Sequence, residues 1–354
     1  MSQPDNVYQH MEIPQAIYYG NSILGIFVNS LAFLVIQRHS RPEIGSYKYL
    51  LLCFAVYWIF SCIINIIILP GLYSWKGAFG LFVTSSIRNT QYFAPISACM
   101  SSASYFSSIF LLVVHFIYRY FAVIRIHFSE DMLKWFKYPY GLIWVVAFIV
   151  YCFDLCITMM EFYQPDQESK EYVRSYFMEN YGVNVDHAYI TVGRYYSSTP
   201  DGVKIRWGVI IRIINLAFIN TMAMIIICIS SWKLYQALKL LESITSKYVK
   251  RLQMQFFKVL AIQTTIPFVT EFLPAIVYYI LSMFGLEIGI YVNAILVIMS
   301  FQPFLHGCTT LIIITDYRRA VKRIIFNFIR IQDGNVSRVE SNPANFMPKS
   351  TASS

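Results

Sequence analysis

The chain has 354 residues, of which 57% are hydrophobic and only 13% carry a charged Asp, Glu, Lys or Arg side chain. Soluble domains carry about 25% charged residues, so this composition excludes an ordinary soluble protein and indicates a membrane protein. The formal net charge of +9 does not indicate nucleic-acid binding, because the basic residues lie beside apolar stretches, where anionic lipid attracts them. We therefore expect the lipid bilayer as a partner and no nucleic acid.

Seven apolar stretches of about 20 residues or more recur along the chain, which is the length that a helix needs to cross a bilayer core about 30 Å thick. Helices satisfy their own backbone hydrogen bonds in lipid, and the stretches lack the alternation of barrel strands. The predicted spans are residues 17–36, 49–72, 93–124, 138–161, 207–234, 255–284 and 288–314. The sequence thus predicts an all-α membrane protein built as a seven-transmembrane helix bundle.

Lys and Arg gather in every second gap between the predicted spans. They follow spans one, three and five and continue after span seven, whereas the opposite gaps hold few apart from one long loop. Basic residues are retained on the cytoplasmic side, and long loops count little toward orientation. We therefore predict a multi-pass protein of the plasma membrane with an extracellular N-terminus.

The long outer loop lies between predicted spans four and five. Residues 167–181 are predicted to form an amphipathic helix that stops at Gly182. Residues 189–196 and 203–207 flank the turn signal at 200–202, Pro-Asp-Gly, which favours a short hairpin lid over the mouth of the bundle. An irregular polar loop fits this segment equally well.

After the last span, apolar and basic residues alternate at helical spacing. A basic amphipathic helix of this kind, expected at residues 317–331, lies flat on the inner leaflet. Residues 332–354 are polar and rich in Ser, Asn and Pro, which predicts a disordered cytosolic tail. The seven-transmembrane domain is therefore expected to comprise residues 1–331.

Four short motifs occur in order along the chain. GSYKYL (45–50) opens the second span, and HFIYRY (115–120) ends the third. QFFKVL (255–260) leads through QTTIP (263–267) to Pro274 in the sixth, and DYRR (316–319) follows the seventh. Together they resemble the Str class of nematode seven-transmembrane chemoreceptors, the class that includes the diacetyl receptor, over most of the chain.

The resemblance implies a bundle like that of G-protein-coupled receptors and a chemosensory (olfactory-type) function. It implies a receptor on the cilia of sensory neurons that binds a small odorant or water-soluble chemical and activates a heterotrimeric G protein. An Arg at the inner end of span three would lock the closed bundle and later contact the G protein; alternatively, it is only an interfacial anchor. The predicted coupling residues are Arg119, Tyr120, Lys247, Lys250, Arg251 and Lys258.

The chain departs from related receptors in two respects. Span seven has Gln302-Pro303 where an Asp often precedes the Pro, so a switch that uses that carboxylate is in doubt. The outer loop has no Cys, so the disulfide that ties this loop to span three in rhodopsin-like receptors cannot form. Pro removes a helix hydrogen bond, and the predicted hinges are Pro267, Pro274 and Pro303.

Three ionisable residues lie inside predicted spans, where such groups are costly and indicate function. We expect Arg212 to pair with Asp154 or Glu271, either to fix a polar ligand in an upper cavity or only to staple the bundle. We expect most of the nearby aromatic residues to serve only in helix packing. The predicted pocket residues are Tyr105, Phe106, Asp154, Arg212, Glu271, Phe272, Tyr278 and Tyr291. We also expect hydrogen bonds between helices from Asn29, Asn65, Asn215 and Asn293.

Other classes of protein remain as alternatives. The sequence has no zinc-binding His pair, phosphate loop, nucleophile elbow or dinucleotide motif, so we expect no enzyme, metal or cofactor. A ligand-gated cation channel of the seven-span odorant-receptor type would require an intracellular N-terminus, and a transporter should show internal repeats. A peptide-activated receptor remains possible because the outer loop is rich in acidic residues.

Overall fold

The computed structural model describes residues 10–124, 130–163, 165–200, 202–240 and 246–340. The α-helices are α1 (Glu12–His39), α2 (Tyr47–Ile68), α3 (Phe93–Ile124), α4 (Leu142–Tyr163), α5 (Gln167–Tyr181), α6 (Trp207–Leu240), α7 (Lys247–Pro267), α8 (Leu273–Met283), α9 (Asn293–Ser300), α10 (Gln302–Ile313) and α11 (Thr315–Glu340). The strands are β1 (Pro70–Trp75), β2 (Ala78–Val83), β3 (Gly193–Arg194), β4 (Tyr196–Thr199) and β5 (Gly202–Ile205). Short helical turns are η1 (Pro42–Ile44), η2 (Ser86–Asn89), η3 (Glu130–Phe136), η4 (Val185–His187), η6 (Phe268–Phe272) and η7 (Gly289–Val292).

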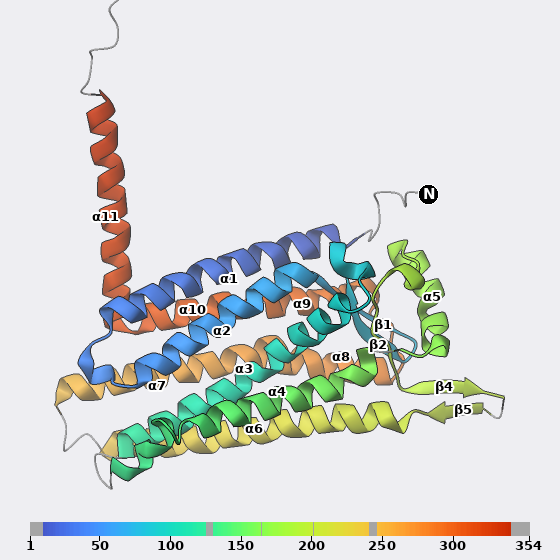
Figure 1. Ribbon diagram of the computed structural model, residues 1–354, viewed down its shortest axis with the longest axis horizontal. Helices are drawn as coiled ribbons and strands as arrows, with labels where there is room; N and C mark the ends of the chain where they lie inside the picture. The colour runs from blue at the N-terminus through green and yellow to red at the C-terminus, as the bar shows by residue number, and fades with distance from the viewer. Residues whose placement is uncertain (1–9, 125–129, 164, 201, 241–245, 341–354) are drawn as a thin grey trace, which may run out of the picture.

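The apolar helices lie side by side and form one elongated bundle (Figure 1). Within the described residues, six helical segments are long and apolar enough to cross a membrane, and Leu142–Ile157 is a shorter apolar helix that joins them. Helices α7 and α8 form the sixth predicted span, and α9 and α10 form the seventh. The predicted seven-transmembrane bundle is therefore confirmed.

All three predicted hinge prolines lie where the helical geometry changes. Pro267 ends α7, and the next residues form the π-helical turn η6. Pro274 lies in the first turn of α8, and Pro303 lies in the first turn of α10, after the break at Phe301. Proline lacks the N–H that would continue the α-helical ladder, so the backbone bonds are rearranged at these points. Movement about them stays a prediction.

A small antiparallel sheet of strands β1, β2 and β3 lies at one end of the bundle (Figure 1). The prediction that span two continues to residue 72 was wrong, because α2 ends at Ile68 and Leu69 takes a left-handed conformation with φ 46°. Strands β1 and β2 join through Lys76 and Gly77, which both have positive φ, as a tight hairpin turn requires.

Helix α5 lies over this sheet with the bounds that the sequence predicts. Its buried face carries Val173, Tyr176 and Phe177, which pack in one cluster with Tyr73 and Phe82 of the sheet. Gly182 ends the helix with φ 63°, a conformation that Gly adopts without steric cost. The predicted amphipathic helix is thus confirmed.

The predicted hairpin exists, but its first strand is different. Strands β4 and β5 pair with each other on either side of the expected turn, of which residue 201 lies outside the described residues. Within the other predicted strand, 189–196, Gly193 and Arg194 pair with β2, and Ile190 bridges Phe82. This segment therefore completes the sheet over the bundle.

Helix α11 leaves the opposite end of the bundle and runs crosswise to the other helices (Figure 1). This direction suits a helix lying on a membrane surface, and the apolar residues Ile324, Ile325 and Phe326 are exposed. The helix continues past the predicted end at residue 331 to Glu340. The rest of the predicted tail, 341–354, lies outside the described residues.

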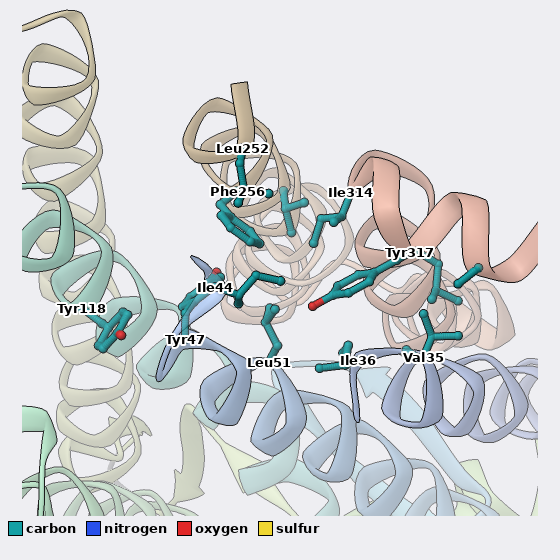
Figure 2. Close-up of a cluster of buried hydrophobic side chains, with 14 of the residues drawn as sticks. Val35, Ile36, Ile44, Tyr47, Leu51, Tyr118, Leu252, Phe256, Ile314 and Tyr317 are labelled. Carbon is teal, nitrogen blue, oxygen red and sulfur yellow. The ribbon is translucent and has the colours of Figure 1, made fainter. Parts of the chain in front are cut away.

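A hydrophobic cluster joins the helices at this same end of the bundle. Figure 2 shows Tyr47 and Leu51 of α2 facing Phe256 of α7, with Ile314 and Tyr317 beside them. Burying one such side chain stabilises a soluble protein by about 1.5–3 kcal/mol, and tight packing provides the stabilisation in lipid. The cluster therefore fixes α7 against α1 and α2 where α11 begins.

Candidate functional site

A small cavity lies between the sheet and the bundle. It has a volume of about 110 Å³ and is bordered by the sheet, α3, α8 and α9. None of the described residues that line it is charged. Its walls are Pro70, Leu72, Phe79, Gly80, Leu81, Ser101, Ser102, Tyr105, Phe106, Thr191, Ala275, Tyr278, Tyr279, Ile295, Leu296 and Met299. The cavity is thus apolar, with several hydroxyl groups that can orient a ligand.

The sheet is attached to the bundle by hydrogen bonds around the cavity. The Tyr278 hydroxyl accepts a bond from the Gly80 N–H at 2.9 Å, and the Asn293 Oδ1 accepts one from the Leu72 N–H at 2.8 Å. A Cβ on Gly80 would lie 2.0 Å from the Thr191 carbonyl oxygen, so only glycine permits this approach. The sheet therefore forms the roof of the cavity, and these contacts hold it in place.

Tyr105 contributes its ring to the cavity wall, while its hydroxyl joins a buried network at the end of the bundle that carries the sheet. The hydroxyl lies 2.9 Å from that of Tyr18 and accepts a bond from the Asn65 Nδ2 at 3.0 Å. Asn65 also accepts a bond from the Ser101 hydroxyl at 2.8 Å. This network links α1, α2 and α3, and it confirms the predicted interhelical role of Asn65.

Two more of the Asn residues named in the sequence analysis form hydrogen bonds to other elements of the structure. Asn29 on α1 donates to the Pro303 carbonyl oxygen at 2.9 Å, at the start of α10. Asn293 binds the sheet, as described above. The prediction for Asn29 is confirmed, and its bond ties α1 to the proline-containing segment of span seven. Asn293 bonds to a strand rather than to another helix.

A second cavity of about 80 Å³ lies between α3, α6 and α8. Phe272 lines it, and Phe106, Ala275 and Tyr279 line both cavities. These three side chains therefore form the boundary between the two spaces. A ligand in the first cavity would touch the same residues that close the second.

The predicted pocket residues divide into two groups. Tyr105, Phe106 and Tyr278 line the roofed cavity and Phe272 lines the second one, whereas the remaining four line neither. Among these, Tyr291 is 78% exposed. The predicted charged residues therefore do not meet the apolar ones in one cavity.

Among the described residues, we find no ion pair of Arg212 with Asp154 or Glu271, the two partners that the sequence suggested. The Arg212 Nη1 donates to the Ile157 carbonyl oxygen at 3.5 Å. Asp154 has a buried Oδ2, to which no described residue donates a hydrogen bond. Similar depth along the helices did not predict this contact of Arg212 with the backbone of α4.

Glu271 has a different partner from the one expected. Its Oε2 accepts a hydrogen bond from the Gln302 Nε2 at 3.1 Å, and both residues are fully buried. Glu271 lies in the π-helical turn after Pro267, and Gln302 precedes Pro303. The bond therefore joins the two spans at their proline-containing segments, through the Gln that stands in place of an Asp.

The base of the outer loop is held by a charged contact outside the membrane-spanning helices. Asp166 caps α5 by accepting a bond from the Ser169 N–H at 2.8 Å, and the Arg206 guanidinium forms an ion pair with its other oxygen. Partial burial raises the pKa of Asp166, but the hydrogen bonds from Ser169 and Arg206 outweigh it and lower this pKa to about 2. The contact ties the start of α5 to the start of α6.

Arg119 lies at the other end of the bundle and is only 3% exposed. Its guanidinium carbon lies 4.8 Å from the ring centroid of Tyr47 and 4.6 Å from that of Phe256. It also donates a hydrogen bond to the Gln253 Oε1. Cations are attracted to aromatic faces, so this aromatic cage joins α3 to α2 and α7.

The other predicted coupling residues lie in different surroundings. Tyr120 is half-buried and packs against Phe121. Four basic residues of α7 lie along a groove beside α10 and α11 rather than beside Arg119, namely Lys247, Lys250, Arg251 and Lys258. The predicted coupling residues thus form two separate sites.

The sequence did not identify the residues of the cavity roof. Phe79 and Gly80 lie in the gap between predicted spans two and three, and Thr191 lies in a predicted strand of the lid. The Lys76-Gly77 turn was the signal that could have revealed the hairpin. Among the described residues, no group of three or more His, Cys, Asp or Glu is placed to hold a metal ion.

Comparisons with known proteins agree with this architecture. The family profile described as serpentine type 7TM GPCR chemoreceptor Str matches residues 15–322. The G-protein coupled receptor str-33 of Caenorhabditis elegans is 25% identical over 306 residues, covering 85% of this chain and 88% of that protein. The serpentine receptor class r-10 of the same organism is 24% identical over 310 residues, covering 86% and 87%.

The solved structure of squid rhodopsin has a similar fold. It matches with a TM-score of 0.54 at 12% sequence identity, covering 98% of each chain. The family profile covers most of the chain. The assignment to a family therefore rests on most of the sequence rather than on the four short motifs alone. The protein is therefore a multi-pass membrane protein that belongs to the Str family of serpentine seven-transmembrane GPCR chemoreceptors.

Proposed function

We propose that this receptor detects a small uncharged chemical, which binds in the cavity under the sheet and activates a heterotrimeric G protein at the other end of the bundle. The observation that carries the proposal is the cavity itself, which is apolar and has no charged side chain among the described residues that line it. A charged ligand would lose its hydration there without a countercharge.

The size of the cavity limits the ligand. An apolar cavity of about 150 Å³ accommodates benzene, so about 110 Å³ suits a molecule of at most about six non-hydrogen atoms. The best tiny ligands gain at most about 1.5 kcal/mol per atom, which limits the affinity to about 10⁻⁷ M. We therefore expect responses at micromolar or higher concentrations.

The route to the inner end runs along spans six and seven. Ala275 and Tyr279 line the cavity on α8, and α8 follows the π-helical turn that contains Glu271. A ligand that fits the cavity better in one arrangement of α8 shifts the population toward that arrangement. The expected result is movement of α7 away from Arg119, which then contacts the G protein together with Tyr120.

The test is a screen of chemicals in a heterologous cell that expresses a promiscuous G protein, with intracellular calcium as the readout. The panel contains neutral compounds of four to twelve non-hydrogen atoms and their charged analogues. We expect activity among small neutral compounds and a sharp loss above about eight atoms. Activity confined to charged compounds or peptides would refute the assignment of this cavity.

We further propose that the N-terminus faces the exterior and that the receptor lies in the plasma membrane of sensory cilia. The distribution of Lys and Arg along the chain supports this orientation. An epitope tag after Ser2 should bind antibody on intact cells. Staining only after permeabilisation would reverse the orientation and favour an ion channel, which patch recording in cells without G proteins would then detect.

A further inference from the structure

Two cysteine side chains contact each other between α3 and α4, near the end of the bundle that carries the sheet. The Cys99 thiol donates toward the Cys156 carbonyl oxygen at 4.0 Å and is also hydrogen-bonded to the Cys156 thiol. Both are free cysteines in the structure. Direct contact of two thiols is the arrangement from which a disulfide bond can close.

Neighbouring contacts show that this meeting follows from the packing of α3 against α4, which lie side by side (Figure 1). The Tyr151 hydroxyl donates to the Phe106 carbonyl oxygen at 3.2 Å, and the ring centroids of Phe110 and Phe148 are 5.7 Å apart. As the residue on α3 advances along the chain, its partner on α4 moves back, so the two helices are antiparallel. The thiol contact continues this same interface toward the sheet.

Helix α4 has few other attachments to the bundle. In the part of α4 whose side chains the structure describes, residues 142–157, only Leu155 is buried. Helices in lipid are held together by tight packing and hydrogen bonds rather than by the hydrophobic effect. A helix with so little buried surface is weakly fixed by packing, and a covalent bond to α3 would hold it more firmly.

The thiol contact lies between the cavity wall and the base of the outer loop. Cys99 is two residues before Ser101, which lines the cavity. Cys156 is 11 residues before Gln167, where α5 begins. The outer loop itself has no Cys, so it cannot be tied directly to span three. A bond between these two thiols would instead connect the cavity wall to the chain that leads to the helix over the sheet.

We propose that Cys99 and Cys156 are joined by a disulfide bond in the mature receptor. Disulfides form and persist in the secretory compartment and at the cell surface. The proposed extracellular N-terminus places this end of the bundle on that side of the membrane. The inference therefore rests on the proposed orientation, and it depends neither on ligand detection nor on G-protein coupling.

The oxidant is a disulfide of the secretory compartment, carried by oxidised glutathione or by an oxidoreductase. The thiolate of one Cys attacks it, which forms a mixed disulfide and releases one thiol of the carrier. The thiolate of the other Cys then attacks the mixed disulfide and releases the second carrier thiol. Two protons and two electrons thus pass from the receptor to the carrier. Cys99 is six residues after Phe93, about 9 Å along α3, so the exchange takes place while these helices are still being assembled.

The test uses the full-length receptor in intact cells. Free thiols are blocked with N-ethylmaleimide before lysis, and receptor from the cell surface is digested and analysed by mass spectrometry with and without reduction. We expect a linked pair of peptides that contain Cys99 and Cys156 in most of this receptor, and we expect it to disappear on reduction. Recovery of both residues as alkylated thiols would overturn the proposal.

Thermal stability, followed by tryptophan fluorescence of the purified receptor, gives a second readout. Cys99→Ser/Cys156→Ser removes the bond without leaving an unpaired thiol, and it should melt several degrees below the unmodified receptor. A phosphine reductant should lower the melting temperature of the unmodified receptor to the same value and leave the double variant unchanged. Equal melting temperatures of the double variant and the unmodified receptor would contradict the anchoring of α4 by this bond.

Cys152→Ser is the matched control, because Cys152 lies one turn earlier on α4 and its thiol bonds to Ser107. It should keep the linked peptides and melt close to the unmodified receptor. A different pair of cysteines linked at comparable yield would indicate unspecific oxidation and overturn the proposal. If the double variant does not fold, the peptides of the unmodified receptor still decide.

The epitope tag after Ser2 tests the orientation separately. The linked peptides together with an intracellular tag would reject only the orientation and keep the disulfide. Reduced thiols would overturn the disulfide on whichever side the tag is found.

Discussion

The guanidinium carbon of Arg119 lies 4.6 Å from the ring centroid of Phe256, and this contact joins the C-terminal part of α3 to α7. This contact forms where the sequence predicts a lock on the closed bundle. Tyr47 completes the cage from α2. Because a desolvated contact between a cation and a ring contributes up to about 2 kcal/mol, the cage is strong enough to bias the position of α7.

Replacing Phe256 should therefore raise the activity of the receptor without ligand. Phe256→Leu keeps an apolar side chain in the core and removes the ring. Loss of about 1 kcal/mol from the closed form corresponds to a roughly fivefold increase in the open population. Basal G-protein dissociation, measured by energy transfer between labelled subunits, should rise by up to this factor.

Phe257→Leu is the matched control, because Phe257 packs against Tyr235 and has no recorded contact with Arg119. It should leave basal dissociation near the level of the unmodified receptor. Equal effects of the two changes at the same surface level would mean that core packing, rather than the cage, sets the basal activity.

Replacing Arg119 itself should remove coupling. Arg119→Ala releases α7 but also deletes the cation that we assign to the G-protein contact. We expect at least a tenfold loss of ligand-stimulated dissociation with the receptor still at the cell surface. Full coupling by Arg119→Ala would reduce Arg119 to a structural cation or interfacial anchor.

The bond between Glu271 and Gln302 should stabilise the bundle. In Gln302→Leu the buried carboxyl group loses its recorded partner, and an unsatisfied buried group costs about 1–3 kcal/mol. The melting temperature of the purified receptor, followed with a thiol-reactive dye, should fall by several degrees.

Glu271→Gln is the companion variant, since an amide can still bond to Gln302. It should melt nearer to the unmodified receptor than Gln302→Leu does. The double variant Glu271→Leu/Gln302→Leu should recover part of the loss because it removes both polar partners. A melting temperature unaffected by Gln302→Leu would show that this bond contributes nothing measurable.

Acidification should loosen the base of the outer loop. The folded pKa of Asp166, about 2, is below the usual value of about 3.9. Its contribution is therefore fully present above about pH 4 and is lost as pH falls toward 2. Hydrogen exchange at the start of α5, corrected for intrinsic rates, should increase across this range.

Asp166→Asn removes the ionisable group and should abolish this particular pH dependence. The variant should also exchange faster at pH 7, where it lacks the ion pair with Arg206. If exchange in the unmodified receptor is independent of pH between 4 and 2, the Arg206 contact does not stabilise the loop.

The sequence predicted the elements that can be recognised from residues close together along the chain. Helix α5 has an amphipathic repeat between an Asp cap and a terminal Gly, and the apolar spans have the length that a bilayer requires. Arg119 could be located because its motif ends an apolar span. Each of these features depends on neighbours along the chain.

The cavity could not be predicted from the same signals. Strands β1 and β2 are rich in apolar residues, and a continuous apolar run does not distinguish a buried strand from a helix. Their contact with Tyr278 joins residues far apart in the sequence. The predicted pairing of Arg212 with Asp154 or Glu271 is not found among the described residues, because helical depth alone does not determine which partner a side chain meets.

The most direct test of ligand detection is to fill the cavity and measure the response. Ala275→Leu adds three carbon atoms at the boundary between the two cavities, whereas Ala294→Leu places them on an exposed face of α9. The readout is G-protein dissociation against the concentration of the most active small compound, at matched surface expression. We predict at least a tenfold loss of potency for Ala275→Leu and little change for Ala294→Leu; identical dose–response curves for the two variants and the unmodified receptor would contradict the account.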